Sequence, residues 1–464
     1  MSISLRLILV CIAFLLLVVS PENLSRSALP HQTELLSPKE EDQLYSYLLR
    51  DKVDQIDSLL NRYSWFNGNI MVVKDHKILY QRSHGYANFQ TREPLTTSSV
   101  FELASVSKQF TAVAILMLYE RKLIDLDDEI KRYLPEITYK DITIRHLLNH
   151  TSGLPNYMYV LEKQSDGSHM PSNEEMLKIL VGSNPNIFFK PGRLYSYSNT
   201  GYALLASVVE RVSGKTFSQF IRENIFHPLE MHNTFTSVEL LDNEFTVSHQ
   251  AVGHRQVWRR FRPNTPVVHD RVLGDKGIHS CLEDLYKWDQ ALYSGQLVSK
   301  QSLEEAYNPV TLSNRRNFPY GFGFRIGKKS EEKYVYHHGL WEGFRTSFIR
   351  YIERGDAIVI LNNTNQRFNN KIINNIEHII EKPVVMSPTH KLALCVIHDG
   401  VPKALEMYNE MIASGMLQHP DANELFGVAQ MLRQINKPVL SSWIYEFYET
   451  TSLCRDVELP LAGK

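Results

Sequence analysis

Segments with the pattern of β-strands lie at both ends of the central region of this chain, and helix-like segments lie between them. The first two, 69–73 and 77–80, flank Asp75-His76 as the arms of a hairpin. The later ones are 320–326, 333–337, 346–351 and 357–361. We expect an α+β fold: an antiparallel sheet flanked by helices and closed by distant segments, with an inserted all-helical subdomain at 142–226.

The run 110–118 is apolar nearly all round, which predicts a buried helix. Ser105-x-x-Lys108 stands at its N-terminal end, and residues three apart share one face of a helix. A serine hydroxyl needs a neighbouring base to act as a nucleophile, and burial favours the neutral amine of lysine, which can take the serine proton. Ser330-x-x-Lys333 has the same spacing, but its charged surroundings predict an exposed turn.

Two further short motifs carry candidate chemistry. Tyr197 and Asn199 offer a phenol and an amide, and an ammonium beside the phenol lowers its pKa, so that it can act as acid or base. His337 ends a predicted strand and can bind a carboxylate or relay protons. Gly339 leaves room for a substrate backbone at the strand edge. Other segments match the same spacings, namely Tyr86-Ala-Asn88 and His398-Asp-Gly400.

The order of these three motifs resembles that of the serine β-lactamase and penicillin-binding-protein superfamily. Three framing segments resemble it as well: His146 to Pro155, Gly274 to Ser280 and Tyr320 to Gly323. The resemblance covers about 65–365 and is strongest to the branch of class C β-lactamases, D-alanyl-D-alanine carboxypeptidases, D-aminopeptidases and related esterases. The chain has His-x-Gly where many β-lactamases carry Lys-Thr-Gly, which favours the peptidases over efficient antibiotic hydrolysis.

The resemblance implies a role for each motif residue. Ser105 is the acylated nucleophile, Lys108 its base and Tyr197 the proton shuttle. Asn199 contacts the substrate amide, and His337 and Gly339 stand on the substrate-binding strand. The backbone N–H groups of Ser105 and Leu340 form the oxyanion hole. The implied protein is a serine hydrolase that acts through an acyl-enzyme on a D-peptide, β-lactam or small ester. The alternative is a penicillin-binding sensor or scaffold that uses the same pocket without turnover.

Composition limits the partners. The formal net charge is −1 and no basic block occurs, so we expect a small-molecule or peptide substrate and no nucleic acid. The four cysteines, Cys11, Cys281, Cys395 and Cys454, are far apart and form no Cys-x-x-Cys pair. His337 and His338 are neighbours on a strand and point to opposite faces, so we expect neither a metal nor a cofactor.

The two ends of the chain differ from its centre. Residues 1–22 hold Arg6 and the apolar run 7–19, which predicts a signal peptide or, because Pro21 disfavours cleavage, a membrane anchor. We therefore expect an exported protein, periplasmic, extracellular or anchored facing outward. Residues 23–64 form a linker and an N-terminal helix, and 65–382 form the hydrolase domain. Residues 383–464 form a helical unit whose pattern resembles tetratricopeptide hairpins, with no partner specified by the sequence.

Overall fold

The computed structural model describes residues 35–63, 65–164, 169–245, 247–258, 260–329, 331–366, 369–382 and 386–453. The chain divides into two compact units, one of residues 52–382 and one that joins residues up to 51 with those from 383 onward. The predicted signal or anchor and Ser330 lie outside the described residues. Within the described ranges, no helix has the length and apolar character that a bilayer crossing requires.

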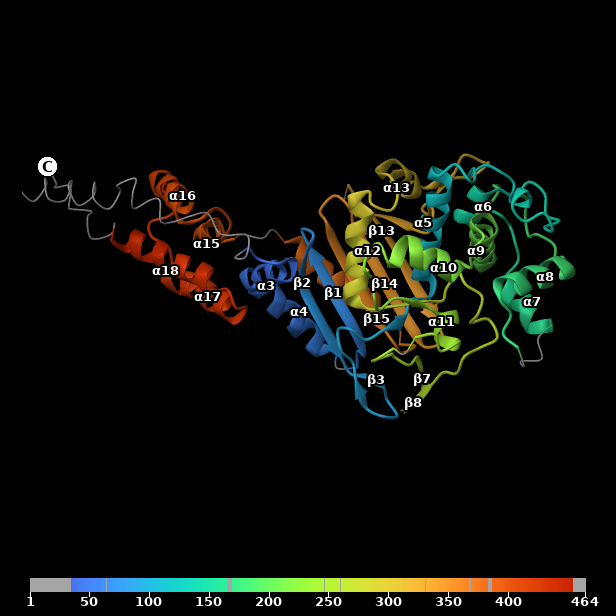
Figure 1. The fold of residues 1–464 in the computed structure, drawn as a ribbon, viewed down its shortest axis with the longest axis horizontal. Coiled ribbons are helices and arrows are strands. Elements are labelled where there is room, and N and C mark those ends of the chain that lie inside the picture. Colours follow the sequence, from blue (N-terminus) through green and yellow to red (C-terminus); the bar gives the residue numbers. More distant parts are fainter. Residues whose placement is uncertain are drawn as a thin grey trace, which may run out of the picture. The chain divides into compact units, whose positions relative to one another are not determined.

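A six-stranded antiparallel sheet forms the centre of the larger unit, in the order β12-β13-β14-β15-β1-β2 (Figure 1). Its strands are β1 (Gly68–Lys74), β2 (Lys77–His84), β12 (Arg325–Lys329), β13 (Glu332–Trp341), β14 (Phe344–Tyr351) and β15 (Asp356–Asn362). Gly68 of β1 pairs with Asn362 of β15, so the two ends of the unit meet in the middle of the sheet. The predicted α+β fold with a sheet closed by distant segments is confirmed.

One predicted strand is shorter than expected. The segment 320–326 enters the sheet only at Arg325, and Tyr320 forms an isolated bridge with that residue. Gly323 between them has a φ of +79°, a left-handed conformation that breaks a strand. The aromatic, β-favouring residues of this segment therefore predict a strand where the backbone makes a turn.

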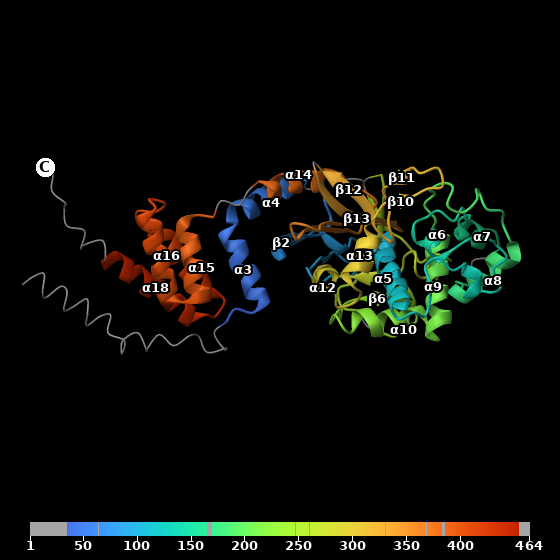
Figure 2. The ribbon, with the colours of Figure 1, turned by 90° about the horizontal axis from the view of Figure 1, so that it is seen from above.

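Helices cover both faces of the sheet (Figure 2). On one face lie α4 (Arg50–Arg62) and α14 (Asn369–Glu381), which Lys52 joins by donating to the carbonyl of Ile379 at 2.7 Å. On the other face α12 (Leu282–Ser294) packs against β1 and β15. Because both faces are covered, every residue of β1 is buried, which explains why its run 70–73 is apolar rather than alternating.

The predicted buried helix is α5 (Ser107–Glu120), whose first twelve residues are all buried. It packs against α9 of the helical insertion and so lies inside the unit. This packing holds the residues at its N-terminal end in place, among them Lys108. The insertion consists of α6 (Ile144–Leu148), α7 (Tyr157–Gln164), α8 (Asn173–Ser183), α9 (Asn199–Ser213) and α10 (Phe217–Ile221).

The segment 238–275 is more ordered than its polar sequence predicts. The helix α11 (Ser237–Leu241) begins it, and a hairpin of β7 (His254–Val257) and β8 (Arg260–Pro263) follows. A small sheet borders this segment, in the order β5 (Phe101–Glu102), β9 (Ile278–Ser280), β6 (Phe235–Thr236). The hairpin strands were not recognised because their arginines and other polar residues leave little of the alternation of apolar and polar residues that marks a strand.

In the described residues of the smaller unit, all regular secondary structure is helical. It contains α3 (Pro38–Leu48), α15 (Pro388–Asp399), α16 (Val401–Ala413), α17 (Ala422–Gln434) and α18 (Pro438–Leu453). Within it α15 packs on α16 and α17 on α18, as two helical hairpins. The sequence grouped α3 with α4 in 23–64, whereas α3 buries Leu44 and Leu48 in the core of the C-terminal helices.

Candidate active site

Ser105 lies on a one-turn helix, η1 (Ala104–Val106), between β5 and α5. Ala104 has a φ of +52°, which a residue with a Cβ rarely adopts, at a cost of roughly 1–3 kcal/mol. Neighbouring hydrogen bonds hold the turn there: the Leu103 N–H donates to the carbonyl of Ile278 at 2.8 Å, and the Thr346 hydroxyl donates to the carbonyl of Leu103 at 2.7 Å. Hydrogen bonds to Ile278 on one side and to Thr346 on the other therefore fix the strained turn, and with it the position of the Ser105 side chain.

Lys108, on the first turn of α5, is fully buried, and its Nζ has three partners. They are the Ser105 Oγ at 3.1 Å, the Asn199 Oδ1 at 2.9 Å and the backbone carbonyl of Asp275 at 2.7 Å. The last two can only accept hydrogen bonds, so they take two N–H groups of the amine. In the neutral amine, the remaining lone pair is directed at the hydroxyl of Ser105, which can donate its proton.

The pKa of Lys108 favours that neutral form. Burial lowers it to about 7, the charge of Asp275 opposes the shift, and the guanidinium of Arg325 adds to it. A lysine in this environment is half deprotonated near neutral pH, whereas an exposed lysine is almost wholly charged. Lys108 can therefore serve as a base for Ser105 under physiological conditions.

Tyr197 places its ring 4.9 Å from the Nζ of Lys108, measured to the ring centroid. Among the described residues its buried hydroxyl has no partner in hydrogen-bond geometry. Burial raises the pKa of Tyr197, although the nearby Ser105 hydroxyl and the Arg325 charge act in the opposite direction. The sequence led us to expect a lowered pKa; instead Tyr197 is a neutral phenol at pH 7, fit to relay a proton and unfit to act as a phenolate base.

Asn199 is the first residue of α9, held by an N-cap in which the Ser198 hydroxyl accepts from the N–H of Gly201. Behind it lies His150, a buried residue whose Nδ1 accepts from the N–H of Ser198 at 3.1 Å and whose ring is 4.3 Å from that of Tyr197. His150 thus fixes the backbone at Ser198, between Tyr197 and Asn199. Both of these residues lie against the Nζ of Lys108, Tyr197 with its ring and Asn199 with its Oδ1.

His337 lies on β13 and is buried. Its Nδ1 must donate to the carbonyl of His338, at 2.8 Å, so its Nε2 accepts from the hydroxyl of Tyr320 at 3.1 Å. Burial, reinforced by the charges of Lys108 and Arg325, holds the pKa of His337 well below its usual value. We expected an imidazole free to bind a carboxylate; both of its nitrogens have protein partners and the ring is neutral.

Gly339 lies where β13 passes the turn that carries Ser105. A Cβ there would stand 2.2 Å from the carbonyl of Leu103 and 2.1 Å from the hydroxyl of Thr346. The carbonyl of Leu103 and the hydroxyl of Thr346 therefore exclude a side chain at this position, and the approach of a substrate backbone to Gly339 stays a prediction. Leu340 follows on the same strand beside η1, and the oxyanion hole formed by its N–H and that of Ser105 stays a prediction.

Sequence reasoning missed two groups at this site. One is the carbonyl of Asp275, a backbone atom that no side-chain motif announces, although the paired glycines at 274 and 277 mark an unusual turn there. The other is Arg325, whose guanidinium carbon lies 5.3 Å from the ring centroid of Tyr197 and 5.8 Å from that of Tyr320. Within the described part of the chain, Arg325 forms no ion pair with a carboxylate, so a positive charge is available beside Tyr197.

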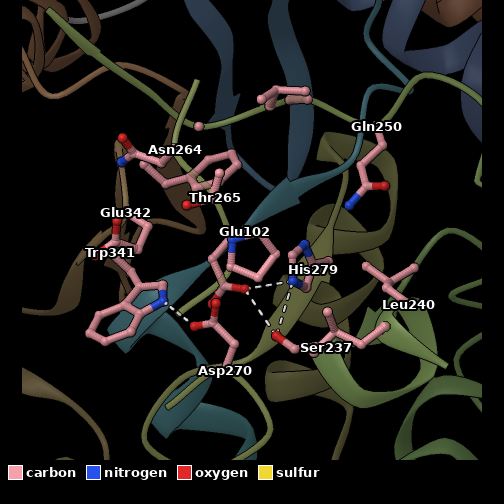
Figure 3. A pocket seen from close by; sticks show the side chains of 16 residues that line it. Glu102, Ser237, Leu240, Gln250, Asn264, Thr265, Asp270, His279, Trp341 and Glu342 are labelled. Atoms are coloured by element: carbon pink, nitrogen blue, oxygen red, sulfur yellow. Dashed lines mark hydrogen bonds and ion pairs between the residues drawn. The ribbon is translucent and has the colours of Figure 1, made fainter. Parts of the chain in front are cut away.

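A cavity of about 280 Å³ lies between segments that flank the site, and none of Ser105, Lys108, Tyr197 and Asn199 is among its lining residues (Figure 3). Trp341, which follows Leu340 on β13, forms part of its wall, as does Glu102, three residues before Ser105. The described residues that line it include three carboxylates and no lysine or arginine; the carboxylates are Glu102, Asp270 and Glu342.

Comparison with known proteins agrees with this geometry. The β-lactamase family model matches residues 54–378. The chain is 37% identical to penicillin-binding protein 4* of Bacillus subtilis over 327 residues, which are 68% of this chain and 72% of that protein. It is 25% identical to a D-aminopeptidase of Gluconobacter oxydans over 309 residues, which are 66% of this chain and 58% of that protein.

Solved structures share the fold. The octameric penicillin-binding protein homologue from Pyrococcus abyssi superposes with a TM-score of 0.61 at 24% identity, covering 74% of this chain and 82% of that one. The D-amino acid amidase from Ochrobactrum anthropi gives a TM-score of 0.58 at 21% identity, covering 72% of this chain and 98% of that one. The family match over most of the larger unit, and the serine with its buried lysine, lead to one conclusion: the chain belongs to the β-lactamase family and is a serine hydrolase.

Proposed function

We propose that the protein hydrolyses an amide or ester whose leaving group carries a carboxylate, through an acyl-enzyme at Ser105, outside the cytoplasm. The observation that carries the proposal is the set of partners around Lys108: two obligate acceptors hold its N–H groups and leave its lone pair for the Ser105 proton. Export rests on the sequence of residues 1–22 alone.

In the first step the Ser105 Oγ attacks the substrate carbonyl carbon while its proton passes to the neutral amine of Lys108. The carbonyl oxygen becomes an oxyanion, which the N–H groups of Ser105 and Leu340 stabilise. The intermediate collapses when the bond to the leaving group breaks and the leaving atom receives a proton, relayed from Lys108 through the phenol of Tyr197. Water then attacks the acyl-enzyme by the same steps in reverse, which releases the acid and restores Ser105.

Arg325 supports the choice of an anionic leaving group. Its charge stands beside Tyr197, on the side from which the leaving group is protonated, and no described carboxylate neutralises it. A guanidinium binds a carboxylate through two parallel hydrogen bonds, which fits the C-terminal carboxylate of a peptide or that of a β-lactam. Penicillin-binding protein 4* and the D-aminopeptidase, by their names, point to the same two substrate classes.

The test is a panel of three probes: a fluorescent penicillin, a D-alanyl-D-alanine peptide and a p-nitrophenyl ester without a carboxylate. We expect a labelled peptide that contains Ser105, identified by mass spectrometry, and turnover of at least one probe. On the high-pH plateau, where the Lys108 amine is neutral, kcat/KM of Arg325→Gln for the two carboxylate-bearing probes is expected to fall roughly 10-fold to 100-fold, and that for the ester to change little, because a lost charged hydrogen bond costs about 1.5–3 kcal/mol.

Each outcome of the panel has a distinct meaning. A Ser105 adduct that forms and persists without turnover supports the penicillin-binding sensor instead of the hydrolase. No Ser105 adduct and no hydrolysis with any probe contradicts the proposed function. An equal loss of kcat/KM for all three probes in Arg325→Gln would show that the arginine does not bind the carboxylate of the substrate.

The activity is also expected to depend on pH through Lys108. Because the neutral amine accepts the proton and its pKa is about 7, kcat/KM should fall about tenfold per pH unit below 7 and level off above it. Burial holds the pKa values of the His150 and His337 imidazoles well below their usual value, so we assign the limb near pH 7 to Lys108. The measurement is a rate profile from pH 5 to 9 with the ester probe.

A variant fixes the sign of this assignment. The charge of Arg325 lowers the pKa of Lys108, so Arg325→Gln should move the acid limb of the profile to higher pH. A limb that stays in place, or moves to lower pH, would assign the titration to another group.

A further inference from the structure

Glu102 is a buried carboxylate in the wall of the cavity, and all of its hydrogen bonds are made inside the protein (Figure 3). Its Oε1 accepts from two backbone N–H groups, that of Ala104 at 3.1 Å and that of Gly277 at 2.9 Å. Its Oε2 lies 2.6 Å from the Nε2 of His279 and 3.4 Å from the hydroxyl of Ser237. Neither the motifs nor the reaction steps assign this residue a role.

The two backbone groups held by Oε1 belong to the two segments that build the reaction centre. Ala104 is the left-handed residue directly before Ser105, at the start of η1. Gly277 lies two residues after Asp275, whose carbonyl receives the Nζ of Lys108, and its φ of +92° is open only to glycine in practice. One oxygen atom therefore spans the nucleophile turn and the loop that orients the base.

The opposite side of the carboxylate is anchored. Glu102 and His279 stand directly across from each other on β5 and β9, so the strand register presents the imidazole to Oε2. Burial pushes the pKa of Glu102 upward, but the His279 ion pair and the Gly277 N–H bring it below its usual value, so the group is ionised at neutral pH. The anchored carboxylate is rigid, as a support for two backbone segments must be.

We propose that Glu102 is a positioning residue for the acylation of Ser105: by binding the N–H groups of Ala104 and Gly277 with one oxygen, it sets the distance between the serine and the carbonyl that orients Lys108. The catalytic part of this inference rests on the proposed function. What the role requires is that Oε1 of Glu102 accepts hydrogen bonds at the distance from the backbone that a glutamate side chain spans. The negative charge is secondary, because Glu102 makes no direct contact with Lys108.

Two substitutions separate reach from charge. Glu102→Gln keeps an oxygen at the same reach and loses the charge; its amide can donate to His279 in the tautomer that carries its proton on Nδ1. Glu102→Asp keeps the charge, but the shorter side chain cannot meet Ala104 and Gly277 while it stays bonded to His279. We expect Glu102→Gln to retain most of kcat, and Glu102→Asp to lose about 10²-fold in kcat with KM little changed, because small misplacements of reacting groups have effects of this size.

Hydrogen exchange tests the positioning without any substrate. In Glu102→Asp the amides of Ala104 and Gly277 should exchange faster than in the wild type, and in Glu102→Gln they should stay protected. The matched control is Asp356→Asn, a buried carboxylate that accepts from the N–H of Asp75 at 3.0 Å and pairs with Lys74 at 3.1 Å on β15. It should lower the melting temperature and leave kcat unchanged.

The results that overturn the inference differ from those that overturn the function. A wild-type rate in Glu102→Asp together with a slow Glu102→Gln would show that the charge matters and the reach does not. Unchanged exchange at Ala104 and Gly277 in Glu102→Asp would remove the positioning role whatever the rates. If the wild type forms no Ser105 adduct, the proposed function fails, and the exchange data still decide whether Glu102 holds the two segments.

Discussion

Ser105→Ala is expected to abolish acylation of the protein, and Lys108→Met to slow it by roughly 10³-fold or more. Of the three described partners of the Lys108 Nζ, only the Ser105 hydroxyl, at 3.1 Å, can donate a proton to its lone pair. Methionine fills the space of the lysine but cannot accept a proton, so the nucleophile keeps its hydrogen as it attacks. The measurement is the second-order rate of labelling by a fluorescent penicillin, with each variant checked for an unchanged melting temperature.

The two substitutions should not add. Because serine and lysine act as one unit, the double variant is expected to be no slower than Ser105→Ala alone. Lys276→Met is a suitable comparison, since Lys276 is also buried and also bonds backbone carbonyls, those of His269 and Val272. Labelling of Lys108→Met at the wild-type rate, in a folded protein, would show that another group takes the Ser105 proton.

Tyr197→Phe is expected to lower kcat on the order of 10²-fold and to leave KM nearly unchanged. Burial raises the pKa of Tyr197, so its phenol is protonated and uncharged at neutral pH. Removing the hydroxyl therefore removes a proton relay to the leaving group and does not change the charge of the site. The effect should be largest with the peptide probe, whose amine must be protonated as it leaves, and small with p-nitrophenyl ester, whose leaving group needs no proton. Steady-state kinetics with these two probes are sufficient.

Tyr195→Phe is the matched control for that variant. The hydroxyl of Tyr195 is likewise buried and, within the described residues, without a hydrogen-bond partner, and its ring stacks on Phe318 at 3.6 Å. No described interaction joins it to Lys108, so kcat should stay at the wild-type value. Equal losses in the two variants would mean that the tyrosines act by packing, and a normal kcat in Tyr197→Phe would end its role as a relay.

Two kinds of site residue can be predicted from the sequence: those that are close together in the chain, and those whose motifs occur in a recognisable order. Ser105 and Lys108 meet because residues three apart share a helix face, a relation that pattern alone reveals. Tyr197 and Asn199 reach the lysine only because α9 packs on α5, which composition cannot show. They were found through motif order and resemblance.

The remaining parts depend on atoms and distances that a residue pattern does not contain. The carbonyl of Asp275 belongs to the backbone, and any residue at that position would supply it. Glu102 lies three residues before Ser105, but its proposed task follows from the register of β5 with β9, which brings it opposite His279. The pKa of Tyr197 was misjudged because burial outweighs a neighbouring cation, and the depth of a side chain is a property of the folded molecule.

The place of β1 between β2 and β15 in the sheet also governs when the protein can fold. β1 can pair with β2 as soon as both are synthesised, but Gly68 meets Asn362 of β15 only after the whole helical insertion has been made. At about 5–20 residues per second, that delay is on the order of 15–60 s, during which the edge of β1 that faces β15 stays unpaired. Contacts this distant along the chain also slow the search for the native pairing, so chaperone dependence and slow refolding from denaturant follow from the same strand order that places Ser105 beside β13.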